Sequence, residues 1–493
     1  MNDVIKAETQ IRFLLNGAEV ALSDVRPDDT LLDWLRLARA LRGTKEGCAE
    51  GDCGACTVLV GRPTPQGLVC EGVNACIRFV GSLHGCHVVT IEHLRGEGGA
   101  LHPVQQAMVD FHGSQCGFCT PGFVMSLYAM WMQDPDPSEA AVEKALQGNL
   151  CRCTGYEPIV KAARAISSYG TLEADFLATE RASVAQRLAA IRAGGRVEVG
   201  TGKDRFVLPA SVDDLAAVLE AEPTATIVAG STDVGLWVTK FMRDIAPVVF
   251  IGHLDELRTI SEHDGVLTIG AGVSYTDAFE TLSARIPALG PLIDRIGGAQ
   301  VRNMGTIGGN IANGSPIGDM PPPLIALGAS LTLRKGGARR TIPLEDFFVA
   351  YGRQDRLPGE FVEAVHVPVP AANTQFAAWK VTKRRDEDIT AVLGAFAMSL
   401  EDGKVASARI AYGGMAATPK RAKAVEAALL GQPWTLATIE AAMQAYPADY
   451  QPISDMRASA EYRMLAAKNL LKRFFLAHGG AEMPVMVTRE RAA

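Results

Sequence analysis

The sequence predicts a multidomain α+β protein, and three observations support this prediction. At 493 residues the chain is too long for one hydrophobic core, and this length is typical of several domains. All ten cysteines lie between Cys48 and Cys153, so the N-terminal third has a chemistry of its own. The hydrophobic pattern also changes along the chain, from strands with one helix, to helices alone, to a mixture of both.

The first segment is predicted to be a small α+β unit that ends near Ile91. Residues Ile11–Leu15 and Ala18–Leu22 alternate around Asn16-Gly17, which is a strong hairpin signal. A helix is expected over Leu31–Ala40, after Asp28 or Asp29. Its apolar stripe would consist of Leu31, Leu32, Leu35 and Leu37. A further strand is expected at Thr57–Val60.

Helices are then expected from Leu101 to Ser168, because proline is tolerated in a first helical turn. Their predicted starts are His102-Pro103, Thr120-Pro121, Ser138 and Tyr156–Pro158. Residues from about 170 to 203 are polar and rich in alanine, which is typical of a linker with some helix.

A mixed α/β region follows, with a last segment from about Phe376. Its expected strands are Thr226–Ala229, Arg258–Ser261, Val266–Ile269, Ser330–Arg334, Arg340–Ile342, Ala391–Leu400 and Lys404–Tyr412. Its expected helices are Val212–Glu220 with Ser211 as cap, one from Thr418-Pro419 to Gly431, and Ala460–His478.

Composition narrows the function classes. The net charge of −7 argues against nucleic acid or an anionic membrane as the main partner. The charged first residues lack the apolar stretch of a secretory signal, and no apolar run reaches the length of a membrane span. The expected location is the cytoplasm, where clustered cysteines indicate metal ligation rather than disulfide bonds.

The first cysteine set has the spacing of a plant-type [2Fe–2S] site. Four residues separate Cys48 from Cys53, two separate Cys53 from Cys56, and Cys76 follows after nineteen more. Glycines in this loop would let the backbone approach a small cluster. A zinc site is the alternative, although zinc favours paired Cys-x2-Cys knuckles. Cys70 competes with Cys76 as fourth ligand, and Cys70 and Cys86 are otherwise interpreted as structural.

The second set consists of Cys116 and Cys119, and of Cys151 and Cys153, in two pairs about thirty residues apart. By spacing alone it fits either a four-cysteine zinc site or a second [2Fe–2S] cluster. Both pairs precede predicted helix starts, and the positive end of a helix dipole favours an anionic cluster.

Two glycine-rich turns are candidates for a pyrophosphate site. Ile227–Val234 is a strand that leads into a turn with two hydroxyl groups, and Gly305–Asn310 is a second turn, followed by Ser315–Asp319. Backbone N–H groups in such turns bind anions. From the residues alone, an FAD site and ordinary tight turns remain open.

Longer motifs resemble the xanthine dehydrogenases and their relatives in the molybdenum hydroxylase family. The motifs of the first cluster are Thr44–Val58 and Asn74–Cys76, and those of the second are Gly113–Gly122 and Gly148–Tyr156. Gly308–Asn310, Ser315–Asp319 and Lys383–Ile389 are similar to motifs of the FAD part. The resemblance covers essentially the whole chain and is to the small, iron–sulfur/FAD subunit of the bacterial two-subunit members.

The resemblance implies a β-grasp ferredoxin-like domain (1–92), a four-helix [2Fe–2S] domain (93–170), a linker (171–203), an FAD domain of the vanillyl-alcohol-oxidase (PCMH) type (204–372) and a C-terminal α/β domain (373–493). It implies two [2Fe–2S] clusters, ligated by Cys48, Cys53, Cys56 and Cys76, and by Cys116, Cys119, Cys151 and Cys153. It implies FAD contacts from Ile227, Val228, Ala229, Gly230, Ser231, Thr232, Asp233, Val234, Thr306, Ile307, Gly308, Gly309, Asn310, Asp319 and Lys380.

The same resemblance implies a partner and an order of electron flow. Molybdenum cofactor would lie on a separate large chain, in a heterotetramer of two small and two large chains, and Gln115 would face the pterin. Electrons would pass to the cluster of Cys116, then to that of Cys48, then to FAD and NAD+, with Arg384–Asp388 near the nicotinamide. The alternatives are the same subunit of an aldehyde or N-heterocycle dehydrogenase, and a stand-alone iron–sulfur flavoprotein.

Overall fold

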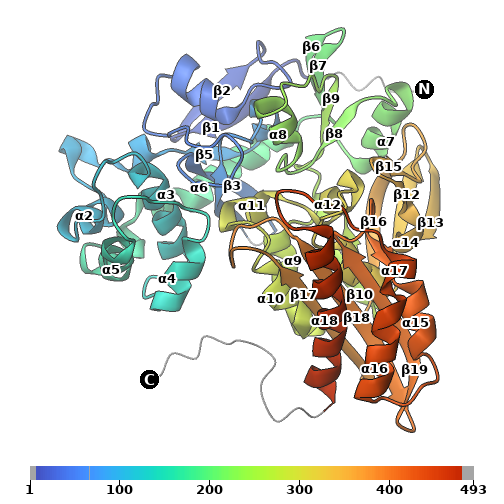
Figure 1. The fold of residues 1–493 in the computed structure, drawn as a ribbon. Helices are drawn as coiled ribbons and strands as arrows, with labels where there is room; N and C mark the ends of the chain where they lie inside the picture. Colours follow the sequence, from blue (N-terminus) through green and yellow to red (C-terminus); the bar gives the residue numbers. More distant parts are fainter. Residues whose placement is uncertain (1–6, 66, 480–493) are drawn as a thin grey trace. The chain divides into compact units, whose positions relative to one another are not determined.

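The computed structural model describes residues 7–65 and 67–479 (Figure 1). These residues divide into two compact units. Of the described residues, the first unit contains those up to Leu257 together with Ser274–Thr276 and Gly297–Thr306. The second contains Arg258–Val273, Asp277–Ile296 and the described residues from Ile307 to Gly479. The expected multidomain α+β architecture is confirmed. None of the helices in the described residues is both long and apolar enough to span a lipid bilayer.

The first unit opens with a five-stranded sheet in the order β2-β1-β5-β3-β4. Its strands are β1 (Ile11–Leu15), β2 (Ala18–Leu22), β3 (Thr57–Thr64), β4 (Gly67–Asn74) and β5 (His87–Val89). Strand β1 pairs antiparallel with β2 and parallel with β5. The predicted hairpin is confirmed, because Asn16 and Gly17 both have the positive φ that a tight two-residue turn needs.

The helix expected at Leu31–Ala40 is only partly correct. An α-helical turn, α1 (Leu31–Asp33), continues as a π-helix over Trp34–Ala38, and the cap is Thr30 rather than either aspartate. The wider π-turn, closed by the N–H of Arg39 on the carbonyl of Trp34, changes the direction of the side chains. Leu37 is therefore 81% exposed and does not belong to the apolar stripe.

The predicted helical region is confirmed, with four helices at the predicted starts. These are α2 (Pro103–Asp110), α3 (Thr120–Trp131), α4 (Glu139–Ala145) and α5 (Glu157–Ala165). Helix α3 is buried along most of its length, and the side chains of Tyr128 and Trp131 lie in the core of this region.

The segment expected to be a linker contains the 17-residue helix α6 (Phe176–Arg192) and the strand β6 (Val197–Thr201). Strand β6 belongs to a sheet in the order β6-β7-β9-β8, with β7 (Asp204–Leu208), β8 (Thr226–Val228) and β9 (Val248–Phe250). Helices α7 (Val212–Ala221), α8 (Val234–Thr239) and α11 (Ala299–Met304) complete the unit. This sheet shares a hydrophobic core with the first one, in which the rings of Phe79 and Phe250 are 6.1 Å apart.

The second unit contains a five-stranded antiparallel sheet in the order β10-β11-β16-β12-β13. Its strands are β10 (Ile260–His263), β11 (Val266–Gly270), β12 (Ser330–Lys335), β13 (Ala338–Pro343) and β16 (Phe361–Pro368), beside the short pair β14 (Phe348–Ala350) and β15 (Arg353–Gln354). Five helices lie between the strands in sequence: α9 (Tyr275–Arg285), whose first two residues belong to the first unit, α10 (Gly290–Ile293), α12 (Ile307–Asn313), α13 (Pro321–Ala326) and α14 (Leu344–Phe347).

The C-terminal part of the second unit packs helices on an antiparallel sheet, β17-β18-β19-β20. Its elements are β17 (Thr374–Val381), β18 (Val392–Glu401), β19 (Lys404–Gly413), β20 (Lys420–Arg421), α15 (Lys423–Leu429), α16 (Leu436–Ala442), α17 (Tyr446–Asp449) and α18 (Ala460–His478). Aromatic side chains fill the space between them, with the rings of Phe396 and Phe474 stacked at 5.2 Å.

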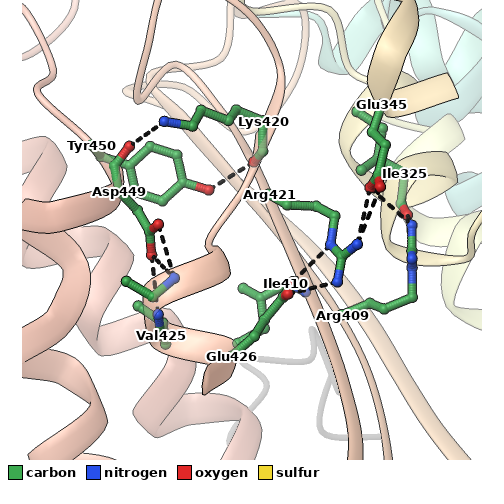
Figure 2. Close-up of polar contacts among 11 residues, drawn as sticks. Ile325, Glu345, Arg409, Ile410, Lys420, Arg421, Val425, Glu426, Asp449 and Tyr450 are labelled. Atoms are coloured by element: carbon green, nitrogen blue, oxygen red, sulfur yellow. Dashed lines mark hydrogen bonds and ion pairs between the residues drawn. The ribbon is translucent and has the colours of Figure 1, made fainter. Parts of the chain in front are cut away.

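The helix start expected at Thr418-Pro419 is wrong, because Lys420 and Arg421 pair with β19 as a short strand. Helix α15 begins at Lys423, and Asp449 at the end of α17 caps it from a distance in sequence. The Asp449 carboxylate accepts the N–H groups of Ala424 and Val425 at 3.0 Å (Figure 2). The predicted stop is consistent with Gly431, which has a φ of +76° just after the helix.

Candidate redox centres

The four cysteines of the first set come together in one place. Cys48, Cys53 and Cys56 lie on the loop before β3, and Cys76 follows β4. Hydrogen bonds from the thiols of Cys53 and Cys76 hold the pKa of Cys48 far below its usual range. Contacts with Cys48, and for Cys76 also with Cys56, raise the pKa of Cys53 and of Cys76. Each thiol of the set therefore contacts at least one other.

The backbone around Cys48 is arranged for an anionic group. The N–H groups of Glu50, Asp52 and Cys53 point at Cys48 Sγ from 3.4–3.5 Å. Gly54 has a φ of +67°, and a Cβ atom there would lie 2.1 Å from the carbonyl oxygen of Gly148. Converging thiols, inward N–H donors and a loop without room for larger residues fit a [2Fe–2S] cluster.

The remaining cysteines of this region are buried away from that loop. Cys70 lies on β4 in an apolar cluster with residues of α6, and burial raises its pKa to about 11. Cys86 lies in the core of the first sheet. These positions support Cys76 rather than Cys70 as the fourth ligand.

In the second set, each cysteine of the pair Cys116 and Cys119 contacts one cysteine of the pair Cys151 and Cys153. Cys119 contacts Cys151, and burial together with this contact raises the pKa of Cys119 to about 12. Cys153 contacts Cys116, and the hydrogen bond between them raises the pKa of Cys153. Cys116 and Cys153 are exposed, whereas Cys151 is buried and accepts a hydrogen bond from the Thr154 hydroxyl at 3.2 Å.

The two helices predicted to begin at the second cysteine set, α3 and α5, start at different distances from its cysteines. Cys119 is the N-cap residue of α3, so that helix begins directly at a ligand position. Helix α5 begins at Glu157, after Tyr156 with its φ of +72°, and therefore starts four residues beyond Cys153. Within the described residues, no group of three histidine, cysteine, aspartate or glutamate side chains has the arrangement of a single-ion site.

The two cysteine loops contact each other. The N–H of Leu150 donates to the carbonyl of Cys53 at 3.0 Å, and the Asn149 amide donates to the carbonyl of Gly54 at 3.3 Å. Gly122 on α3 packs so closely that a Cβ atom would lie 2.1 Å from the same Gly54 oxygen. A single backbone hydrogen bond thus joins Cys53 of the first set to the residue that precedes Cys151 of the second.

Gln300 on α11 is a residue of this junction that the sequence analysis missed. Its side chain is 2% exposed, and its amide nitrogen donates to the Thr57 hydroxyl at 3.1 Å and to Asn149 Oδ1 at 3.0 Å. It also contacts Ser126 Oγ and the carbonyl of Gly148. No local pattern marks this glutamine, because its partners lie more than 150 residues away in sequence.

The first glycine-rich turn lies in the first unit. Ile227 and Val228 belong to β8, Ala229–Asp233 form the turn, and Val234 begins α8. Ser231 is buried with a φ of +58°. A Cβ atom on Gly230 would lie 1.6 Å from the carbonyl of Met304, so this turn packs against the backbone that leads to Thr306. The tight approach fits a turn whose N–H groups face a phosphate.

Thr306 also lies in the first unit, and the other expected FAD residues lie in the second unit. Ile307, Gly308, Gly309 and Asn310 form the first turns of α12, and Gly308 packs against Ala271 with no room for a Cβ atom. Asp319 and Lys380 form a buried ion pair of 2.7 Å, and the Thr390 hydroxyl donates to the other Asp319 oxygen. The second unit therefore brings Asp319 and Lys380 together.

Arg295 holds the start of the charged loop that contains Arg384–Asp388. Its guanidinium donates to the carbonyls of Lys380 and Arg385 at 2.7 and 3.0 Å, and to the Thr382 hydroxyl at 2.8 Å. Lys380 donates back to the carbonyl of Arg295 at 3.1 Å. The loop is thus fixed at its start by the half-buried guanidinium of Arg295 and by the ion pair of Asp319 with Lys380.

Comparison with known proteins accounts for most of the chain. Residues 13–79 match the 2Fe-2S iron–sulfur cluster binding domain, and residues 90–164 match the [2Fe-2S] binding domain. Residues 201–370 match the FAD binding domain in molybdopterin dehydrogenase, and residues 377–478 match the CO dehydrogenase flavoprotein C-terminal domain.

A solved chain of carbon monoxide dehydrogenase from Hydrogenophaga pseudoflava is 32% identical, with a TM-score of 0.52, over 54% of this chain and 94% of its own length. This chain belongs to the molybdenum hydroxylase family. Within that family it carries the [2Fe–2S] and FAD domains, and the fold class predicted from the motifs is confirmed. Quinoline 2-oxidoreductase from Pseudomonas putida 86 is similar over 55% of this chain and 94% of its own, with 27% identity and a TM-score of 0.50.

Similarity to xanthine dehydrogenases extends over nearly the whole of this molybdenum hydroxylase chain. The Emericella nidulans enzyme is 34% identical over 94% of it, and the Gallus gallus enzyme, a xanthine dehydrogenase/oxidase, is 30% identical over 86%. The chain spans 38% and 36% of the length of these relatives.

Proposed function

We propose that this chain is the electron-transfer subunit of a xanthine dehydrogenase in purine catabolism, with a large molybdenum-cofactor chain as partner and NAD+ as acceptor. When bound, two [2Fe–2S] clusters and FAD would supply one-electron transfer and its conversion to hydride transfer. The observation that carries the proposal is the contact between the two cysteine loops, through Leu150 and Cys53.

Exposure of the cysteines supports the direction of electron flow. Cys116 and Cys153 lie at the surface, where a donor on a partner chain can approach them, and the neighbouring Gln115 is also exposed. Cys151 is buried and lies beside Leu150, which contacts the loop of the first set. The second set would therefore receive electrons and the first would pass them toward FAD.

The flavin contacts proposed for Ile227–Val234, Thr306–Asn310, Asp319 and Lys380 rest on the two tight glycine approaches and on the buried ion pair. The loop that Arg295 holds would then lie near the nicotinamide of NAD+. We propose the cytoplasm as the location and a heterotetramer of two small and two large chains as the assembly.

A second candidate is the equivalent function in another molybdenum hydroxylase. It is favoured by the similarity to solved chains of carbon monoxide dehydrogenase and quinoline 2-oxidoreductase. Those chains cover just over half of this one, whereas the xanthine dehydrogenases match both the iron–sulfur and the flavin parts in one polypeptide. That fusion is the reason for placing xanthine first.

The test is to purify the chain alone and together with the large molybdenum-cofactor chain proposed as its partner. The chain alone should contain about four iron atoms and about one FAD, and should oxidise NADH with a dye acceptor but not xanthine. The complex should reduce NAD+ with hypoxanthine or xanthine. Turnover of quinoline or carbon monoxide instead of purine would establish the second candidate. A full-length chain that has no molybdenum partner in its own cells would point to a stand-alone flavoprotein.

A further inference from the structure

Helix α8 connects the glycine-rich turn to the loop of the first cysteine set. The helix begins at Val234, directly after the turn, and ends at Thr239. The Thr239 hydroxyl donates to the carbonyl of Ala49 at 2.7 Å, and Lys240 Nζ donates to the carbonyl of Cys48 at 2.5 Å. Gly235 packs against Ile77 with no room for a Cβ atom, next to the fourth cysteine of the set.

Lys240 is thus a cation in contact with a ligand residue. The Cys48 sulfur already accepts three backbone N–H groups from its own loop, and Lys240 adds a full positive charge on the carbonyl side of the same residue. Glu50 lies beside it, with one carboxylate oxygen 3.4 Å from Lys240 Nζ. The side chains of Lys240 and Glu50 are 37% and 42% exposed, so water and salt screen both charges.

These charges act on the reduction of a bound cluster because reduction adds one negative charge to it. A nearby cation stabilises the reduced form more than the oxidised form, and a nearby carboxylate does the opposite. The Lys240 ammonium touches a ligand residue, whereas Glu50 contacts the ammonium itself. We therefore expect the lysine to have the larger effect, so that the pair together raises the reduction potential of the cluster.

We propose that Lys240 raises the reduction potential of the cluster held by Cys48, Cys53, Cys56 and Cys76, and that Glu50 opposes it. The inference rests on the proposed function only in that these cysteines hold a [2Fe–2S] cluster. It makes Lys240, the residue that follows α8, a determinant of how readily electrons reach this cluster.

The experiment is a redox titration of the full-length, cluster-loaded chain, followed by electron paramagnetic resonance. Lys240→Gln should decrease the equilibrium constant for reduction of one cluster about tenfold, which corresponds to a potential lower by about 59 mV for one electron. The potential of the Cys116 cluster should not move, and it serves as the internal reference. Lys240→Arg should retain the wild-type potential, and Thr239→Ala removes a neutral hydrogen bond to the same loop and should leave it nearly unchanged.

Glu50→Gln is an independent test. Removal of the carboxylate should raise the reduction potential of the same cluster, whereas Lys240→Gln should lower it. The difference between Lys240→Gln and wild type should shrink as salt is raised, since exposed charges are screened. An unchanged potential in Lys240→Gln, an equal shift of both clusters, or a decrease in Glu50→Gln would overturn the inference. Absence of both cluster signals from the wild-type chain would instead refute the proposed function, and the inference with it.

Discussion

The backbone N–H of Leu150 donates to the carbonyl oxygen of Cys53 across 3.0 Å, which joins the loop before Cys151 to the loop of the first cysteine set. Both residues lie in stretches without regular secondary structure, so this bond and its neighbours determine how the two sets face each other. Gln300 completes the junction from α11, because it contacts Thr57 after Cys56 and Asn149 before Leu150. The junction therefore depends on buried polar groups.

Gln300→Ala should destabilise this junction. The substitution leaves the acceptor groups of Thr57, Ser126 and Asn149 buried without their donor, at a cost of about 1–3 kcal/mol. The measurement is the free energy of unfolding of the cluster-loaded chain in denaturant, followed by visible absorption. Gln186→Ala, at an exposed position on α6, is the matched control and should change stability by less than about 0.5 kcal/mol. Equal free energies of unfolding for the two variants would show that the Gln300 hydrogen bonds do not stabilise the junction.

Cys76→Ser and Cys70→Ala should differ in iron content. Cys76 contacts Cys48 and Cys56, so its loss should lower the iron from about four to about two atoms per chain and remove one cluster signal. Cys70 lies in an apolar cluster, and its replacement should keep both clusters. The measurements are iron analysis and electron paramagnetic resonance. Two intact clusters in Cys76→Ser would mean that the ligand assignment is wrong.

Asp449→Ala should destabilise the C-terminal part of the second unit by about 0.5–2 kcal/mol, because α15 loses its cap. The neighbouring ion pairs of Arg421 with Glu345 and Glu426 remain in this variant (Figure 2). Asp449→Asn keeps one acceptor oxygen and should lose less stability than the alanine variant. Thermal unfolding measures both, and a larger loss in the asparagine variant would contradict capping.

The cap of α15 also shows why part of the fold escaped the sequence analysis. Starts marked by local residues were predicted correctly, as with Ser138 before α4 and Ser211 before α7, because their side chains cap the next turn of the same segment. Helix α15 has no such residue at its start and uses Asp449 instead, so Thr418-Pro419 gave a false signal. The π-turn after α1 was missed because hydrophobic spacing does not distinguish it from an α-helix.

In the candidate site too, features set by residues close in sequence were predicted, and features set by distant residues were missed. Cysteine spacing identified both sets, because ligand geometry constrains residues that are close in sequence. Gln300 connects the loops of the two sets, and Lys240 contacts the loop of the first set. Both come from distant segments, and neither has a residue type that marks a site in the sequence. Only the fold brings them to Thr57 and to Cys48.

His87 on β5 makes the stability of the first unit depend on pH. Its side chain is fully buried, and burial, with smaller contributions from His93 and Arg187, lowers its pKa to about 4. The Nε2 atom accepts the N–H of Gly17 at 3.1 Å, so the ring is held in its neutral form. The unfolded chain binds a proton near pH 6.5, hence stability is complete above that value and falls between about pH 6.5 and about pH 4. The expected loss is about 2–4 kcal/mol.

Denaturant unfolding of the chain at several pH values measures this loss, with hydrogen exchange of β1 and β5 as the local probe. His87→Gln removes the titrating group, so its stability should change less over the same interval, even if its stability at pH 7 is lower. His263→Gln is the control, because its side chain is 89% exposed on the β10–β11 turn and should leave the wild-type pH dependence intact. A wild-type chain whose β1 and β5 amides keep the same protection factors at pH 7 and pH 4.5 would show that burial of neutral His87 does not set the pH dependence.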